Sequence, residues 1–192
     1  MGESLKGTRT EKNLLAAFAG ESQARNRYTY FAGQARKEGF MQIANIFEET
    51  ALNEKEHAKI FFTYLEGGDV EIVAAYQAGM IKDTKSNLEA AAAGEKMEWT
   101  TIYADFAKIA REEGFQEVAV SFDQISQVEK FHEARYRKLV SNVADGEVFK
   151  KKATTKWHCT NCGYVHEGTE APTLCPACKH PQSYYEVLAE NY

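Results

Sequence analysis

Four long segments of the chain repeat apolar residues at alternating intervals of three and four. The clearest repeat covers residues 115–145, and its members are Phe115, Val118, Phe122, Ile125, Glu129, His132, Tyr136 and Leu139. Residues 40–66 repeat Phe40, Ile43, Phe47, Thr50, Glu54, His57, Phe61 and Leu65. Residues 10–37 repeat Leu14, Phe18, Glu21, Ala24, Tyr28, Phe31 and Ala35, and residues 86–113 repeat Leu88, Ala91, Glu95, Glu98, Ile102, Phe106 and Ile109. This spacing predicts four helices, each with one face towards a shared core.

Glycines and one capping pattern mark the limits of these helices. The four segments are followed in turn by Gly39, Gly67-Gly68, Gly114 and Gly146, and glycine commonly ends helices. Thr8-x-x-Glu11 has the form of a capping box at the start of the first helix. Short turns make the first and second helices, and the third and fourth, antiparallel neighbours, whereas roughly 17 residues join the second to the third and can cross a bundle. The sequence thus predicts a mainly α-helical, ferritin-like four-helix bundle with a long crossover.

The first half of the bundle resembles the second half. Matching segments are 19–21 with 93–95, 35–40 with 110–115, and Glu54-x-x-His57 with Glu129-x-x-His132. The first match has an offset of 74 residues and the other two have 75, so one residue is inserted after Glu95. Tyr28 and Tyr103 already differ by 75. Because a single inserted residue in a helix is often absorbed as a π-bulge, we predict one near Glu98.

Seven metal-binding side chains interrupt the apolar faces of the four helices. They are Glu21, Glu54, His57, Glu95, Glu98, Glu129 and His132. Burying a carboxylate costs several kcal/mol unless it is paired, and these faces carry no lysine. Two Glu-x-x-His pairs plus glutamates from the other two helices form the ligand set of di-iron or di-manganese carboxylate bundles. We therefore predict a site for two iron ions.

For three residues, Tyr28, Tyr103 and Glu98, the sequence allows two interpretations. Tyr28 and Tyr103 lie close to the ligands, where they either donate hydrogen bonds to the carboxylates or simply pack in the core. Glu98 has no counterpart in the first half of the repeat. It is either a metal ligand or a glutamate that faces solvent.

The C-terminal part of the chain predicts a second metal site. The four cysteines form two pairs, Cys159-x-x-Cys162 and Cys175-x-x-Cys178. Two such pairs build a tetrahedral four-thiolate site, and the spacing alone admits either zinc or iron. The segments 162–164 (Cys-Gly-Tyr) and 175–178 (Cys-Pro-Ala-Cys) resemble the two loops of rubredoxins, which favours one iron ion, with zinc as a substitute. Trp157, Tyr164 and Tyr184 or Tyr185 are expected to shield it, and His158, His166 and His180 are not expected to be ligands.

Composition divides the chain and excludes several classes of protein. All three prolines lie in residues 172–181, which predicts a ferritin-like di-iron domain at 1–146, a linker at 147–155 and a rubredoxin-like four-cysteine domain at 156–192. The net charge of −5 without a long basic run argues against nucleic-acid binding. No apolar run spans a membrane, and residues 1–9 do not resemble a signal peptide. Because all cysteines belong to the metal site, we expect a cytoplasmic protein.

Taken together, these motifs resemble the rubrerythrin family over essentially the whole chain. The quoted markers are the segment 19–26 (Ala-Gly-Glu-Ser-Gln-Ala-Arg-Asn), Glu54-x-x-His57, Glu95-x-x-Glu98, Glu129-x-x-His132 and the rubredoxin-like tail. The resemblance implies a non-haem di-iron peroxidase that reduces hydrogen peroxide to water in defence against oxidative stress. It also implies electrons from an external reductase, of the NADH-peroxidase type, or a rubredoxin, and a homodimer or larger homo-oligomer.

The same resemblance assigns roles to individual residues. It implies that Glu54 and Glu129 bridge the irons, that Glu21 holds one of them and that Glu95 with His132 holds the other. Glu98 is expected to bind in the oxidised state and His57 to replace it on reduction. The expected catalytic set is Glu98, His57, Tyr28 and Tyr103, and a ligand carboxylate or a nearby tyrosine is expected to supply the protons. No cofactor beyond the metals is expected.

Other functions fit parts of the same pattern. A ferroxidase, an iron-storage protein or an oxygen-reducing di-iron protein would use the same bundle, although storage needs no rubredoxin-like tail. A protein with structural zinc at the cysteines would have no path for electrons into the bundle.

Overall fold

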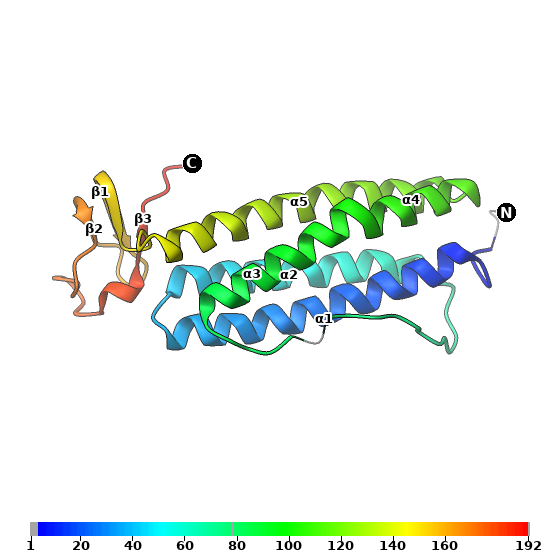
Figure 1. Ribbon diagram of the computed structural model, residues 1–192, viewed down its shortest axis with the longest axis horizontal. Helices are drawn as coiled ribbons and strands as arrows, with labels where there is room; N and C mark the ends of the chain where they lie inside the picture. The colour runs from blue at the N-terminus through cyan, green and yellow to red at the C-terminus, as the bar shows by residue number, and fades with distance from the viewer. Residues whose placement is uncertain (1–3, 78, 192) are drawn as a thin grey trace.

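Helical rods run side by side along the long axis of the molecule, and a small β-sheet domain lies at one end (Figure 1). The structure is a computed structural model, and it describes residues 4–77 and 79–191. Residues 1–3, the start of the segment that does not resemble a signal peptide, lie outside this part. The helices are α1 (Arg9–Lys37), α2 (Met41–Thr63), α3 (Thr84–Met97), the π-helical turn η1 (Glu98–Ile102), α4 (Tyr103–Glu112) and α5 (Gln116–Ala144). The mainly helical, ferritin-like architecture predicted from the sequence is confirmed.

The ends of the helices follow local chemistry. The side chain of Thr8 accepts the backbone N–H of Glu11 at 3.0 Å, as in a capping box. The Glu11 carboxylate returns to the N–H of Gly7 at 2.7 Å rather than to that of Thr8, so the box is shifted by one residue. Helix α2 ends at Thr63, before the expected residue 66. The N–H groups of the next two residues bond three residues back instead of four, so the last turn tightens before the glycine pair.

The third helical rod contains the predicted π-bulge. The π-helical turn η1 begins at Glu98 and separates α3 from α4. The inserted residue shifts the helix face by one position, which the predicted apolar stripe did not take into account. Tyr103, Ala107 and Ala110 are buried, whereas the expected core residues Ile102, Phe106 and Ile109 are half-buried. This part of the prediction is wrong by one residue.

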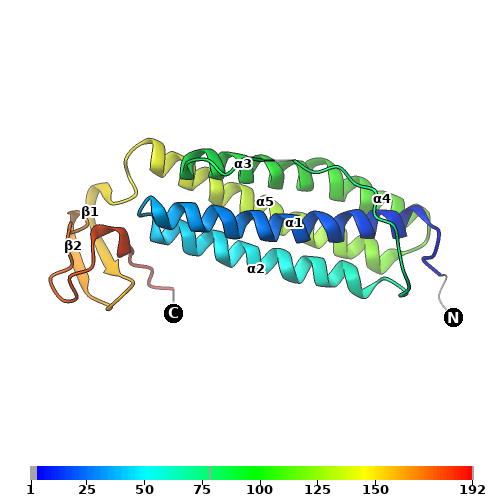
Figure 2. The same cartoon turned by 90° about the horizontal axis from the view of Figure 1, so that it is seen from below.

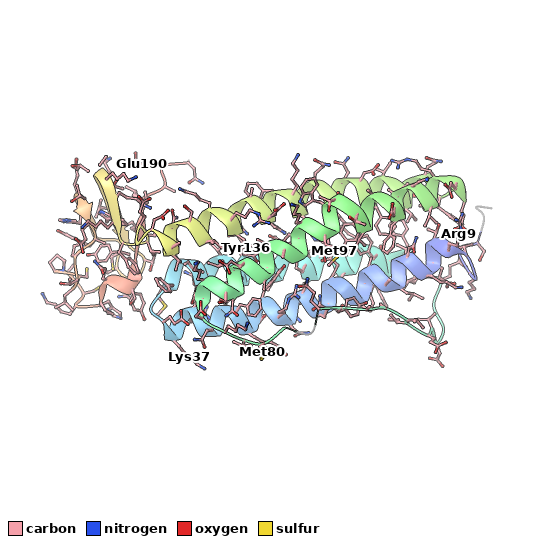
Figure 3. The ribbon with its side chains drawn as sticks, viewed as in Figure 1. Arg9, Lys37, Met80, Met97, Tyr136 and Glu190 are labelled. Atoms are coloured by element: carbon pink, nitrogen blue, oxygen red, sulfur yellow. The ribbon has the colours of Figure 1, made fainter. Side chains whose placement is uncertain are left out.

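The bundle core consists of two apolar clusters. The cluster nearer the sheet domain contains Phe31, Phe47, Leu88, Tyr136 and Leu139 among its members. The cluster nearer the N-terminus contains Leu14, Phe61, Tyr103, Phe122 and Ile125. Figure 3 labels Tyr136, which has no exposed surface and lies inside the bundle. The buried glutamates and histidines lie between the two clusters, so packing on both sides holds them in place.

A long segment joins the end of α2 to the start of α3. It lies outside α1 in Figure 1 and runs across α4 and α3 in Figure 2. The hydroxyl of Tyr76 in this crossover donates a hydrogen bond to the backbone carbonyl of Ala16 in α1 at 3.0 Å. The long predicted crossover is therefore present, and one side chain fastens it to the bundle. Within the described ranges, no helix is long and apolar enough to cross a membrane.

A three-stranded antiparallel sheet forms the C-terminal domain, in the order β2-β1-β3. Its elements are β1 (Lys150–Cys159), β2 (Val165–Glu170), the 3₁₀ turn η2 (Gln182–Tyr184) and β3 (Tyr185–Val187). Strand β1 starts inside the segment 147–155 that was expected to be a linker, and the domain boundaries stay a prediction. Phe149 stacks on Phe40 with ring centroids 6.1 Å apart, which joins the sheet domain to the end of the bundle.

Candidate metal centres

Six of the seven predicted metal-binding side chains of the bundle come together at its centre. Their ligand atoms form two groups, each with atoms within 4.8 Å of one another. One group comprises Glu21, Glu54, His57 and Glu129, and the other comprises Glu54, Glu95, Glu129 and His132. Glu54 and Glu129 belong to both groups. The geometry is that of two adjacent ion sites that share two carboxylates.

The atoms within these groups lie in positions that suit cations. The Nδ1 atom of His57 is 3.0 Å from Glu54, 2.9 Å from Glu129 and 3.7 Å from Glu21. The Nδ1 atom of His132 is 2.8 Å from Glu129 and 3.2 Å from Glu54. Each nitrogen has one proton at most for several carboxylates. Buried oxygens without a well-oriented hydrogen bond among the described residues include Glu21 Oε2, Glu54 Oε1, Glu95 Oε2 and both oxygens of Glu129.

The electrostatics of the metal-free site support the same interpretation. Burial, followed by repulsion from Glu54, raises the pKa of Glu21 to about 8. The same two causes raise the pKa of Glu95 well above its ordinary range. Burial alone would lower the pKa of His132, but hydrogen bonds with Glu129, Glu54 and Glu95 raise it to about 12. Without metal, protons have to balance this buried charge, and bound cations would replace them.

Two tyrosines from neighbouring helices hold two of the carboxylates. Tyr28 in α1 donates a hydrogen bond to Oε1 of Glu95 at 2.5 Å. Tyr103 in α4 donates one to Oε1 of Glu21. Burial is the main cause that raises the pKa of both hydroxyls well above the ordinary value for tyrosine. Both hydroxyls therefore keep their protons near neutral pH and stay hydrogen-bond donors.

Glu98 differs from the other six predicted ligands because it lies outside both groups. It is the first residue of η1 and is half-buried. Its side chain lines two cavities beneath the crossover, one of about 320 Å³ and one of about 60 Å³. Burial, followed by repulsion from Glu95, raises its pKa well above the usual range. Glu98 thus lies between the carboxylate cluster and space that small molecules can occupy.

The four cysteines also form a group that fits one metal ion. The sulfur of Cys159 is 3.8 Å from that of Cys178, and the sulfur of Cys162 is 3.7 Å from that of Cys175. Metal–sulfur bonds of about 2.3 Å in a tetrahedron place the sulfurs about 3.8 Å apart. The domain core packs the buried residues Trp157, Cys159, Ala171, Cys175 and Tyr185, with Tyr164 and Tyr184 beside them. The three C-terminal histidines lie outside the metal-binding group.

Sequence reasoning missed the residues that support the π-helical turn. The indole N–H of Trp99 donates to Glu133 at 2.7 Å, and the Ser126 hydroxyl donates to the Trp99 carbonyl at 3.3 Å. Glu133 also accepts from Arg137 at 2.6 Å. The position of Trp99 beside the inserted residue was the available signal. No pattern in the sequence showed that Tyr76 of the crossover would lie over Glu98.

Comparison with protein families agrees with both metal centres. Residues 12–140 match the family model described as rubrerythrin, and residues 157–186 match the one described as the rubredoxin-like domain of rubrerythrin. The chain belongs to the rubrerythrin family. It is a di-iron protein of that family with a rubredoxin-like domain. The predicted cofactors, two iron ions in the bundle and one at the cysteines, agree with the three ligand groups.

Relatives within the rubrerythrin family cover almost the whole chain. Rubrerythrin of Nitratidesulfovibrio vulgaris is 60% identical over 99% of this chain and 100% of its own length. Rubrerythrin of Porphyromonas gingivalis is 57% identical over 100% of this chain and 96% of its own length. The structure of nigerythrin in its mixed-valence state aligns with a TM-score of 0.64 at 28% identity, over 97% of this chain and 92% of that chain.

Proposed function

We propose that this rubrerythrin-family protein is a cytoplasmic peroxidase that reduces hydrogen peroxide to water. The reaction consumes one hydrogen peroxide, two protons and two electrons and yields two water molecules. The observation that carries the proposal is the presence of two distinct centres in one chain. A buried glutamate–histidine site beside open cavities can take a small oxidant, and a four-cysteine site suits one-electron transfer.

The chain's own residues have separable roles in this proposal. When bound, two ferrous ions supply the two electrons, one each. Glu54 and Glu129 belong to both ligand groups, which supports the proposal that they bridge the two ions. Glu21 with His57 would hold one ion, and Glu95 with His132 the other. Cys159, Cys162, Cys175 and Cys178 would hold the iron through which electrons return.

Protons and ligand exchange complete the proposal. The hydroxyls of Tyr28 and Tyr103 are hydrogen-bonded to Glu95 and Glu21, so they can pass protons through these carboxylates to the leaving oxygen. Glu98 would bind metal in the oxidised state and withdraw towards its cavity on reduction, when His57 takes its place. The half-buried position of Glu98 on a π-helical turn supports this mobility.

The distance between the centres bears on the proposed homo-oligomer. The sheet domain lies at the end of the bundle where α2 begins. Along α2, Met41 and Glu54 are about 20 Å apart. Electron transfer within one chain would therefore have to cross at least this distance. This supports a homodimer or larger assembly in which the four-cysteine domain of one copy serves the bundle of another, with an external reductase or rubredoxin as donor.

Substitution of Glu98 tests the proposal against the alternative functions. We expect Glu98→Ala to lower steady-state peroxide consumption by about 10-fold or more, with iron still bound at both centres. Glu89→Ala on the same rod is the control, because Glu89 is exposed and pairs with Lys85 rather than with a predicted ligand. An unchanged rate in Glu98→Ala would remove Glu98 from the reaction. Iron uptake far beyond the three sites per chain would favour storage, and faster turnover with dioxygen would favour an oxidase.

A further inference from the structure

The two cavities beside Glu98 share part of their lining, including one large side chain of the crossover. The larger cavity, of about 320 Å³, is lined by Tyr76, Gly20, Glu98, Tyr103 and Phe106 among others. The smaller one, of about 60 Å³, is lined by Tyr76, Gln23, Arg27, Gly94 and Glu98 among others. Ala75, Tyr76, Glu98 and Ile102 line both. Two residues of the proposed site, Glu98 and Tyr103, therefore border space that reaches the crossover.

Tyr76 is held over this space by two contacts with α1. Its hydroxyl donates to the carbonyl of Ala16 at 3.0 Å. Its ring edge lies 3.6 Å from the point where a side chain at Gly20 would begin. Gly20 directly precedes Glu21, so this contact places the ring next to the proposed metal site. Tyr76 is still 42% exposed, which places it at the boundary between the bundle and solvent.

The smaller cavity suits a molecule of the size and polarity of hydrogen peroxide. A water molecule needs about 10–15 Å³ of cavity volume measured with a water-sized probe, so about 60 Å³ is enough for a molecule with two oxygen atoms. The wall includes polar groups of Gln23, Arg27 and Glu98. By contrast, the largest groove described between α1 and α2 is lined by none of the predicted ligands.

We propose that Tyr76 is a specificity-determining residue that keeps oxidants larger than hydrogen peroxide out of the smaller cavity beside Glu98. The inference rests on the proposed peroxidase function. Removal of the ring would join the two cavities and open them to organic hydroperoxides. Removal of the hydroxyl alone would keep the ring volume in place.

The test compares hydrogen peroxide with tert-butyl hydroperoxide on reduced, iron-loaded protein. We expect Tyr76→Ala to raise the rate with tert-butyl hydroperoxide relative to that with hydrogen peroxide by about 10-fold or more. Tyr76→Phe should keep most of the wild-type selectivity. Tyr30→Ala is the control, because Tyr30 is an exposed tyrosine of α1 that lines neither cavity. Thermal unfolding checks that each variant folds.

A second measurement separates this inference from the proposed function. Azide binding to the oxidised protein, followed by absorbance, reports access to the site without turnover. We expect azide to bind faster to Tyr76→Ala than to wild type and Tyr30→Ala. If wild type reacts with no hydroperoxide, the proposed function fails, while faster azide binding would still support this entrance. Unchanged selectivity together with unchanged azide binding in Tyr76→Ala would overturn the inference.

Discussion

The hydroxyl of Tyr28 donates a hydrogen bond of 2.5 Å to Glu95, although 67 residues separate them in the sequence. Tyr103 and Glu21 repeat this relationship on the other side of the site. Because each tyrosine holds a carboxylate and a proton, we expect Tyr28→Phe and Tyr103→Phe each to slow peroxide reduction by about 10-fold. Stopped-flow absorbance of the reduced protein mixed with peroxide gives the rates.

Phenylalanine keeps the ring in the core, so both variants should keep their fold and their metals. Tyr30→Phe is the matched control at an exposed position of α1. Wild-type rates in both variants would show that the two tyrosines only pack and carry no proton.

The π-helical turn depends on support from α5. Ser126 donates to the Trp99 carbonyl at 3.3 Å. We expect Ser126→Ala to lower the free energy of unfolding by about 1 kcal/mol, because a partly buried carbonyl loses its donor. Ser141→Ala, which breaks an exposed bond to Asp145, should cost less. Chemical denaturation gives both values, and equal losses would mean that Ser126 does not support the turn.

Metal removal should change how stability depends on pH. In the metal-free protein, burial followed by repulsion from Glu54 raises the pKa of Glu21 to about 8, from 4.5. The folded state then keeps a proton that the unfolded chain releases between these values, so stability falls as pH rises through this range. His132, whose pKa is raised to about 12, acts in the same direction above its ordinary 6.5.

We therefore expect the metal-free protein to melt at a lower temperature at about pH 8.5 than at about pH 5.5. Bound iron replaces the protons, so the loaded protein should lose this dependence or reverse it. Calorimetry of both forms in matched buffers tests this. The same slope in both forms would show that these carboxylates and histidines do not bind the metal.

The four-cysteine centre should be needed for repeated turnover, but not for the reaction of one peroxide with a bundle that is already reduced. Cys175 is buried, and its sulfur lies 3.7 Å from the sulfur of Cys162. Cys175→Ser therefore removes one thiolate of the proposed tetrahedron. We expect the rubredoxin-type colour to disappear and reductase-driven turnover to fall to background. A chemically reduced bundle should still consume one peroxide. Full turnover in the colourless variant would contradict the proposed route for electrons.

Much of the bundle was predictable because its signals are local. Helical periodicity identified the rods, and the internal repeat located the inserted residue near Glu98, where η1 begins. The six predicted ligands that come together were visible because charged residues on an apolar helix face need compensation. The shift to Tyr103, Ala107 and Ala110 as core residues followed from the same insertion, but the predicted stripe ignored it.

Features that depend on tertiary contacts were not predictable. The crossover lacks periodicity, so nothing in its sequence placed Tyr76 against Ala16 or above Glu98. The support of Trp99 by Ser126 and Glu133 joins two rods whose register becomes known only after packing. The start of β1 at Lys150 also depends on its pairing with Glu170.

The most direct test of the central claim is rapid anaerobic mixing of the fully reduced, iron-loaded protein with hydrogen peroxide or with dioxygen. The absorbance of the ferric four-cysteine centre reports whether electrons leave it for the bundle. We predict that peroxide restores this colour quickly and that dioxygen does so slowly. A faster response to dioxygen, or a four-cysteine centre that stays reduced or colourless with both, would contradict the claim that this protein is a peroxidase supplied by its own rubredoxin-like domain.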